Sequence, residues 1–259
     1  PNPNNVKNFF DTGVKSTTSV SFAKGGDDYS LRATGRVNQS TLPIPNASRD
    51  SYDLNINGSI DLSDKLTMYS SLNARIQNTD NTAGSGYTTL MSNFSQWWQR
   101  QLDMDRIKDN YHYEGAFYTW NRRSARNARP QYWDAPHYEQ YQNTNNNENS
   151  TYSGNFGFDY NIMDGLSANV EVNRRAYNRT SWNRGYIGQN TLNTQASYGE
   201  GSFVSEQNEF RASLKYNTDI TDKLDLNALV GYEAKQFRSI STSASTSGGL
   251  AIPDFYTIA

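Results

Sequence analysis

The chain has 259 residues, of which 35% are hydrophobic and 19% are charged, and its formal net charge is −2. This near-neutral charge, without a basic stripe, argues against a nucleic-acid-binding protein. The absence of cysteine excludes both a disulfide framework and a zinc–thiolate site. No apolar run approaches the ~18 residues of a membrane helix. The first five residues lack the basic start and apolar core of a signal peptide, so we expect a mature, excised or incomplete chain.

The first predicted hairpin lies near the start of the chain. Residues 17–22 alternate weakly between apolar and polar side chains, and a turn rich in glycine and aspartate follows at residues 25–28. Residues 29–38 then alternate strongly. A period of two is that of a β-strand, because successive side chains point to opposite faces. We therefore predict two antiparallel strands here.

The strongest alternation runs from residue 52 to residue 76 and breaks once, at residues 63–65. If the chain folds back at this break, the apolar side chains of the two halves face one another. The predicted opposed pairs are Leu62 with Leu66, Ile60 with Met68, Gly58 with Ser70, Ile56 with Leu72, and Leu54 with Ala74. Opposed residues share a face, so this register puts the apolar set on one side of a long hairpin.

Two further hairpins repeat this pattern, at residues 156–173 and 210–232. The three tight reversals share one form, which is an aliphatic residue, a three-residue break with aspartate at its centre, and then leucine. The central aspartates are Asp64, Asp164 and Asp222.

Long segments without strand rhythm separate the hairpins, near residues 77–151 and 178–205. Four hairpins give eight strands joined alternately by tight turns and long loops, which is the asymmetry of an outer-membrane barrel. A soluble sandwich would explain the alternation, but not the length of the strands or the sorting of the loops. We predict an all-β fold, an antiparallel transmembrane β-barrel sector, with the three aspartates in periplasmic turns. Both ends of the eight strands would lie on the long-loop side, so we expect part of a larger barrel.

Several motifs resemble those of SusC/RagA-type TonB-dependent outer-membrane transporters. The segment Asn8–Gly13, with the strand and turn after it, resembles the entry to the barrel in that family. Further similar segments, in the same order, are Trp97–Met104, Thr119–Arg122, Gln131–Asp134 and Gly154–Asn155. The chain departs from the family pattern at Gln131, and neither the plug domain nor the TonB box lies within these residues.

The resemblance implies that residues 1–259 are part of one barrel domain of about twenty-two strands with a plugged lumen. It implies import of oligosaccharides or peptides across the outer membrane of a Gram-negative, Bacteroidota-like bacterium. A SusD-like surface lipoprotein would cover the barrel, TonB would supply energy through other parts of the protein, and a dimer of SusCD pairs is one assembly that the resemblance allows. The alternative is a small structural or adhesive outer-membrane barrel without a transport role.

Aromatic residues in the first long loop are the candidate contacts for cargo or lid. Apolar residues recur at three- and four-residue spacing from Leu90 to Leu102, which predicts a short amphipathic helix. Aromatic rings bind ligands, but they also pack a loop onto its own protein. Neighbouring side chains on a helix diverge by about 100°, so one tryptophan of the adjacent pair is expected to remain free for a partner. The candidates are Trp97, Trp98, Tyr132 and Trp133.

Other candidate sites have simpler explanations. Asp103, Asp105 and Asp109 lack the glycine and closing glutamate of a calcium loop, so we interpret them as acidic residues at a solvated helix end. His112 and His137 are the only histidines and no Gly-x-Ser-x-Gly motif occurs, so we predict no enzyme activity, no metal and no cofactor. We expect a mixed-charge network on the polar side of the strands, formed by Arg32, Arg36, Arg211, Lys215, Asp53, Asp61 and Glu233.

Overall fold

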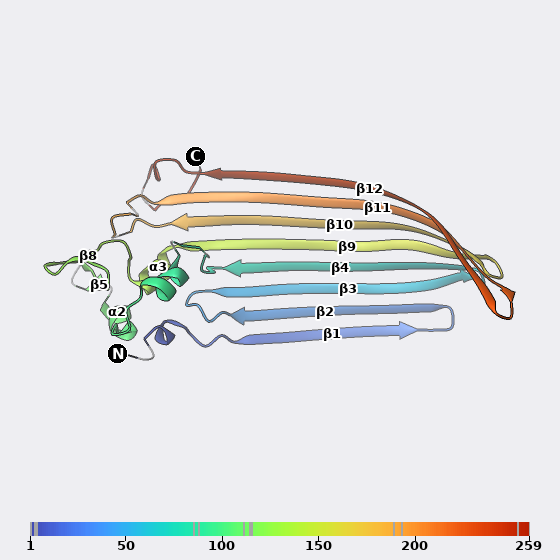
Figure 1. The fold of residues 1–259 in the computed structure, drawn as a ribbon, viewed down its shortest axis with the longest axis horizontal. Coiled ribbons are helices and arrows are strands. Elements are labelled where there is room, and N and C mark those ends of the chain that lie inside the picture. Colours follow the sequence, from blue (N-terminus) through green and yellow to red (C-terminus); the bar gives the residue numbers. More distant parts are fainter. Residues whose placement is uncertain are drawn as a thin grey trace.

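The structure is a computed structural model in which eight long strands form one open antiparallel sheet (Figure 1). Each strand pairs with its neighbours in chain order, so that β1 and β12 are the two edges. The strands are β1 (Lys15–Gly25), β2 (Tyr29–Thr41), β3 (Ser48–Ser63), β4 (Leu66–Asp80), β9 (Thr144–Met163), β10 (Leu166–Gly185), β11 (Ser197–Thr221) and β12 (Leu224–Ser245). The described residues are 2, 5–84, 86, 87, 89–110, 112, 113, 116–188, 190–192, 194–252 and 254–258, without the side chains of 110, 112, 113, 116 and 117.

Tight turns join the strands at one end of the sheet, and longer segments join them at the other (Figure 1). Two of the turns consist of Asp64–Lys65 and Asp164–Gly165, and a third lies at residues 222–223. The chain begins and ends at the other end of the sheet, beside the long loops (Figure 1). The predicted sorting of short turns and long loops is therefore confirmed.

The predicted register of the second hairpin is confirmed for four of its five opposed pairs, which run from Ile60↔Met68 to Leu54↔Ala74. The pair Leu62 with Leu66 is wrong, because Ser63 lies opposite Leu66 and the register shifts between Asp61 and Ser63. An extra residue at such a shift is left outside the ladder and bends the strand. The turn is therefore one residue shorter than the predicted break.

Similar register shifts occur beside the other two tight reversals, next to Leu166 and between Asp219 and Thr221. Gly165 lies at φ 77°, where a side chain is strained. A Cβ atom at Gly165 would also collide with the backbone carbonyl oxygen of Asn217. Glycine is thus required twice over at this turn, once by the backbone conformation and once by the neighbouring strand.

The boundaries predicted for both long loops are wrong. The interval predicted at residues 178–205 is strand at both ends, since β10 continues to Gly185 and β11 begins at Ser197. The loop predicted to end at residue 151 ends before Thr144. These strand ends are mostly polar and show no regular apolar alternation, while their backbone ladder continues regardless of side-chain polarity. The loops are therefore shorter, at residues 81–143 and 186–196.

The loop of residues 81–143 contains several short elements. They are α1 (Leu90–Ser92), the π-helix η2 (Asn93–Trp97), α2 (Met104–Asn110), β5 (His112–Tyr113), β6 (Ala116–Phe117), β7 (Arg122–Ser124), β8 (Asn127–Pro130) and α3 (Pro136–Gln142). The helix expected from Leu90 to Leu102 is confirmed only as far as Trp97, because Trp98 has extended backbone (φ −68°, ψ 132°). No helix in the described part of the chain is long and apolar enough to cross a membrane.

The buried apolar core lies in the loops and not on the sheet. Phe9, in the 3₁₀ helix η1 (Lys7–Phe9), packs with Leu90 and Met104, and all three side chains are buried. On the sheet, by contrast, the apolar face carries exposed side chains such as Phe156 (44%) and Val172 (49%), which lie opposite one another in the ladder. We call this side the apolar face, and the side that carries Asn155 and Asn173 the polar face. A water-soluble protein rarely leaves so extended an apolar surface uncovered.

Candidate functional site

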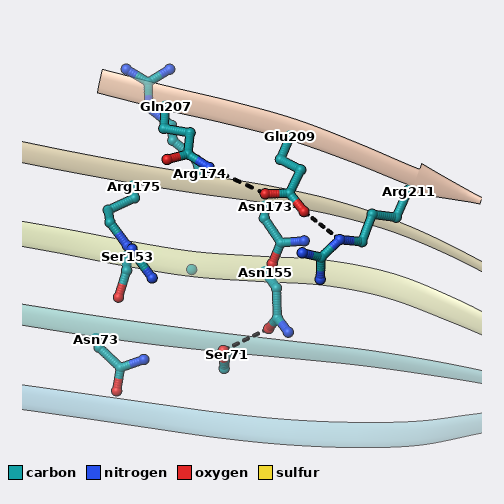
Figure 2. Close-up of a pocket in the computed structure, with 11 residues that line it drawn as sticks. Ser71, Asn73, Ser153, Asn155, Asn173, Arg174, Arg175, Gln207, Glu209 and Arg211 are labelled. Carbon is teal, nitrogen blue, oxygen red and sulfur yellow. Dashed lines mark hydrogen bonds and ion pairs between the residues drawn. The ribbon is translucent and has the colours of Figure 1, made fainter. Parts of the chain in front are cut away.

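A groove on the polar face crosses strands β4, β9, β10 and β11 (Figure 2). Alternation along each strand and the observed register bring its side chains together, because directly opposed residues share a face. Figure 2 shows amide, hydroxyl and charged side chains that reach across the strands from both sides of the groove. They include Ser71, Asn73, Ser153, Asn155, Asn173, Arg175, Gln207, Glu209 and Arg211.

Glu171 is a centre of hydrogen bonding beside this groove. Its carboxylate accepts hydrogen bonds from Tyr69 Oη at 3.1 Å, Asn155 Nδ2 at 3.1 Å and Asn173 Nδ2 at 2.6 Å. Asn155 in turn accepts a 2.6 Å bond from Ser71 Oγ, which Figure 2 also shows. Side chains of three strands are thereby fixed relative to one another. Hydrogen bonds to a charged carboxylate are stronger than those between neutral groups.

A charge network continues from Glu171 to the edge strand β12. Arg211 forms ion pairs with Glu209, with Glu233 (Nε to Oε2, 3.4 Å) and with Glu171 (Nη1 to Oε1, 3.9 Å). Lys235 pairs with Glu233 and lies 3.9 Å from Glu209. Glu209 is only 7% exposed, so its charge requires these partners. Of the seven residues expected in one mixed-charge network, Arg211 and Glu233 belong to this one. Asp53 pairs with Arg75 instead, and no ion pair among the described residues involves Arg32, Arg36, Lys215 or Asp61. Sequence reasoning did not identify Glu171 or Glu209.

The two adjacent tryptophans of the loop differ in environment. Trp98 is partly buried and packs against the rings of Phe94 at 5.2 Å and Trp120 at 5.6 Å. Trp97 is 48% exposed, and its ring lies 6.5 Å from that of Tyr87. The two side chains thus differ in exposure, but Trp98 follows the helix and is not part of it, so the helical geometry behind the prediction does not apply to this pair. The sequence alone does not reveal which of the two tryptophans is the exposed one.

Tyr132 and Trp133 lie in a separate part of the loop, between β8 and α3. Tyr132 is 52% exposed, and its backbone N–H donates to Asn121 Oδ1 at 2.8 Å. The carbonyl of Trp133 accepts a 2.9 Å hydrogen bond from Thr119 Oγ1. Among the ring contacts of the described residues, none joins Trp97 or Trp98 to this pair. Ring packing among the described residues therefore does not join the four candidates into one cluster.

Asp134, which sequence reasoning did not single out, connects two loops. Its buried carboxylate (2% exposed) accepts hydrogen bonds from Tyr186 Oη at 2.5 Å and Asn190 Nδ2 at 2.7 Å. Both partners lie in the loop of residues 186–196, more than fifty positions away in the sequence. The only sequence signal is an aspartate after two large aromatics, which does not reveal its distant partners.

The other candidate groups have structural partners. Asp103 Oδ1 accepts from the backbone N–H of Arg106 at 3.1 Å, and Asp105 Oδ2 accepts from Asn8 Nδ2 at 2.8 Å. Asp103 therefore caps the start of α2, as expected of an acidic residue at a helix end. Within the described residues, no group of three or more acidic or histidine side chains could hold a metal ion. The side chain of His112 lies outside the described residues.

Burial shifts the pKa of two groups on α3. It lowers the pKa of His137 to about 4, with a smaller contribution from the charge of Lys108. The His137 ring packs 4.9 Å from that of Phe9, in a position that suits a neutral imidazole. Burial also raises the pKa of Glu139 to about 7, and the negative charge of Asp134 adds to the shift.

Solved structures with a similar fold include chains of the RagAB peptide importer. A chain of its open-open state matches 94% of these residues with a TM-score of 0.72 at 17% identity, and one of its closed-closed state matches 96% with a TM-score of 0.73 at 15% identity. A chain of the RagAB peptide transporter matches 98% with a TM-score of 0.70 at 16% identity. At such identities the likeness is one of fold. The present chain covers 26%, 27% and 29% of those three chains.

Sequence comparisons are less informative. The family described as "Protein of unknown function, DUF481" matches residues 187–252, which is a minor part of the chain. No curated protein matches the sequence.

The raised pKa of Glu139 predicts a pH-dependent loop. Between its ordinary pKa and about 7, the folded loop holds this proton more tightly than the unfolded chain does, so the free energy of unfolding falls as the pH rises through that range. Glu139→Gln removes the titration. Hydrogen exchange of residues 136–142 should be alike in parent and variant at about pH 5, and slower in the variant at about pH 8.

A matched control is Glu148→Gln, which removes the same charge at an exposed position on β9. It should change exchange in residues 136–142 at neither pH. An effect of Glu139→Gln that is equal at both pH values would contradict the prediction.

Proposed function

We propose that this chain is a sector of the β-barrel domain of a SusC/RagA-type TonB-dependent transporter in the outer membrane of a Gram-negative, Bacteroidota-like bacterium. The observation that carries the proposal is the eight-stranded antiparallel meander, apolar on one face, polar on the other, with tight turns at one end and loops at the other. Its likeness in fold to chains of the RagAB peptide importer supports this reading. The complete barrel would have about twenty-two strands.

In this proposal the apolar face contacts lipid and the polar face lines the lumen. Ile56, Leu72 and Leu214 would then face lipid, while Asn57, Asn73 and Lys215 would face the lumen. The exposure of large apolar side chains on the sheet supports the assignment, because lipid would cover them. The mostly polar strand ends beside the long loops would rise beyond the bilayer, since ~9–11 residues suffice to cross it.

The cargo in this proposal is a peptide, as in the RagAB importer that shares the fold. Oligosaccharides are the other cargo that the resemblance implies. A SusD-like lipoprotein would cover the loop end, TonB would supply energy, and two such pairs would associate as a dimer. The chain would catalyse no reaction. The alternative, a small structural or adhesive barrel, is disfavoured because closure of eight strands would pair β1 with β12, and the structure leaves them as separate edges.

The lipid-facing assignment can be tested with two neighbouring residues of β3. A lysine at the bilayer midplane on the lipid face of a barrel costs about 2–4 kcal/mol. Ile56→Lys should therefore lower the free energy of unfolding in lipid by about this amount, whereas Asn57→Lys should cost far less. Equilibrium unfolding of both variants in lipid vesicles measures the difference. Equal costs would contradict the assignment of faces.

The orientation in the membrane can be tested by labelling. In the proposal Asp64, Asp164 and Asp222 lie in periplasmic turns, and the loop of residues 81–143 lies outside the cell. A cysteine in place of the exposed Ala125, at the turn between β7 and β8, should react with a membrane-impermeant maleimide on intact cells. A cysteine in place of Asp64 should react only after the outer membrane is opened. The reverse pattern would invert the topology.

The proposal assigns Trp97, Trp98, Tyr132 and Trp133 to the mouth of the transporter, with Trp97 as the contact for lid or cargo. Trp97→Ala should reduce peptide uptake and co-purification of the lipoprotein while the loop stays folded, because the exposed Trp97 ring supports little packing. Trp98→Ala is the matched variant, and it should accelerate hydrogen exchange in the loop, because Trp98 packs against Phe94 and Trp120. Unchanged uptake and co-purification in Trp97→Ala would contradict the assignment of Trp97 as a contact for lid or cargo.

A further inference from the structure

A second groove lies on the polar face, at the loop ends of β1, β2, β3 and β4. We call it the basic groove. Four cations and one carboxylate line it. The charged residues are Lys15, Arg36, Arg49, Arg75 and Asp53.

The strand register explains how these charges come together. Arg36, Asp53 and Arg75 are directly opposed on three successive strands. Lys15 and Arg49 both lie opposite Ser40, one on each side of it, and belong to a row nearer the loops. Opposed residues share a face, so all five side chains belong to one wall.

The single carboxylate of this groove is already engaged. Asp53 Oδ1 lies 3.6 Å from Arg75 Nε, and Asp53 Oδ2 accepts a 3.2 Å hydrogen bond from Asn38 Nδ2. Within the part of the chain that the structure describes, no ion pair involves Lys15, Arg36 or Arg49. All three side chains are exposed, so the basic groove keeps an uncompensated positive charge.

The charge balance of the first groove is different. Arg211, which lines that groove, and the nearby Lys235 share the carboxylates of Glu171, Glu209 and Glu233 through ion pairs. These ion pairs connect neighbouring strands, and they give Arg211 and Lys235 acidic partners within the chain. In the basic groove, by contrast, Lys15, Arg36 and Arg49 have no such partners among the described residues, so these three cations are available to a ligand.

We propose that the basic groove binds the carboxylate side chains of acidic peptide cargo. This inference rests on the proposed function, from which the peptide class comes; the preference for acidic peptides comes from the groove. A guanidinium presents its N–H groups in a planar fork that matches a carboxylate and forms two parallel hydrogen bonds with it. A concave wall of one charge also attracts oppositely charged ligands over distance and raises their local concentration.

The test compares the parent protein, as it is produced in outer membranes, with the variant Arg36→Gln/Arg49→Gln. The probes are a fluorescent glutamate-rich peptide and the same peptide with glutamine at each glutamate. The parent should bind the glutamate peptide more tightly, and the variant should bind it about three- to tenfold more weakly while the glutamine peptide is unaffected. Rising salt should weaken binding of the glutamate peptide to the parent, because salt screens exposed charges.

The matched control is Lys24→Gln, which removes an exposed cation at the opposite end of β1 and should leave binding unchanged. If the double variant fails to insert, Arg49→Gln alone and the salt dependence of the parent decide the question. Equal binding of both peptides by the parent would overturn the inference and leave the proposed function standing. A preference for an acidic oligosaccharide over the glutamate peptide would also overturn it. Uptake of no peptide of either charge would overturn both the inference and the proposed cargo.

Discussion

One constraint dominates the structure: no described part of the chain covers the apolar face of the long sheet. Side chains such as Phe156 and Val172 alternate into that face and stay exposed, while the buried apolar residues lie in the loops. Burial of apolar surface is the main favourable term in folding. The exposed apolar face of the sheet does not contribute that term within the chain, and in the proposed function it is the face that lipid covers.

The charged side chains of the polar face are arranged in two different ways. Around Glu171 and Glu209, hydrogen bonds and ion pairs join successive strands and neutralise the cations. Toward the loop ends of β1 to β4, Arg36 and Arg49 remain without acidic partners among the described residues. The polar face thus combines a charge network that connects neighbouring strands with a basic groove whose positive charge is available to a ligand. The second part carries the inference about acidic cargo.

The loops are ordered by a small core of their own. Phe9, from the segment before β1, packs with Leu90 and Met104, and its ring also meets His137. Asp134 then joins the loop of residues 81–143 to that of residues 186–196. Because these contacts fix the loop end, the exposed Trp97 is presented on a folded surface and not on a free tail.

The sequence by itself determined the strands, the tight turns and most of the register, because a period of two and the opposed apolar pairs are local properties of the chain. It failed where that signal is absent. The polar ends of β10 and β11 were predicted as loop, since ladder hydrogen bonds leave no trace in side-chain polarity. Only the tertiary structure decided that Asp134 meets Tyr186, that Trp98 and not Trp97 is packed, and that Arg36 lacks an acidic partner in the described part of the chain. Asp134 meets a partner more than fifty positions away, Trp98 packs against Trp120 as well as against the nearby Phe94, and the charge around Arg36 depends on three neighbouring strands, none of which a local pattern encodes.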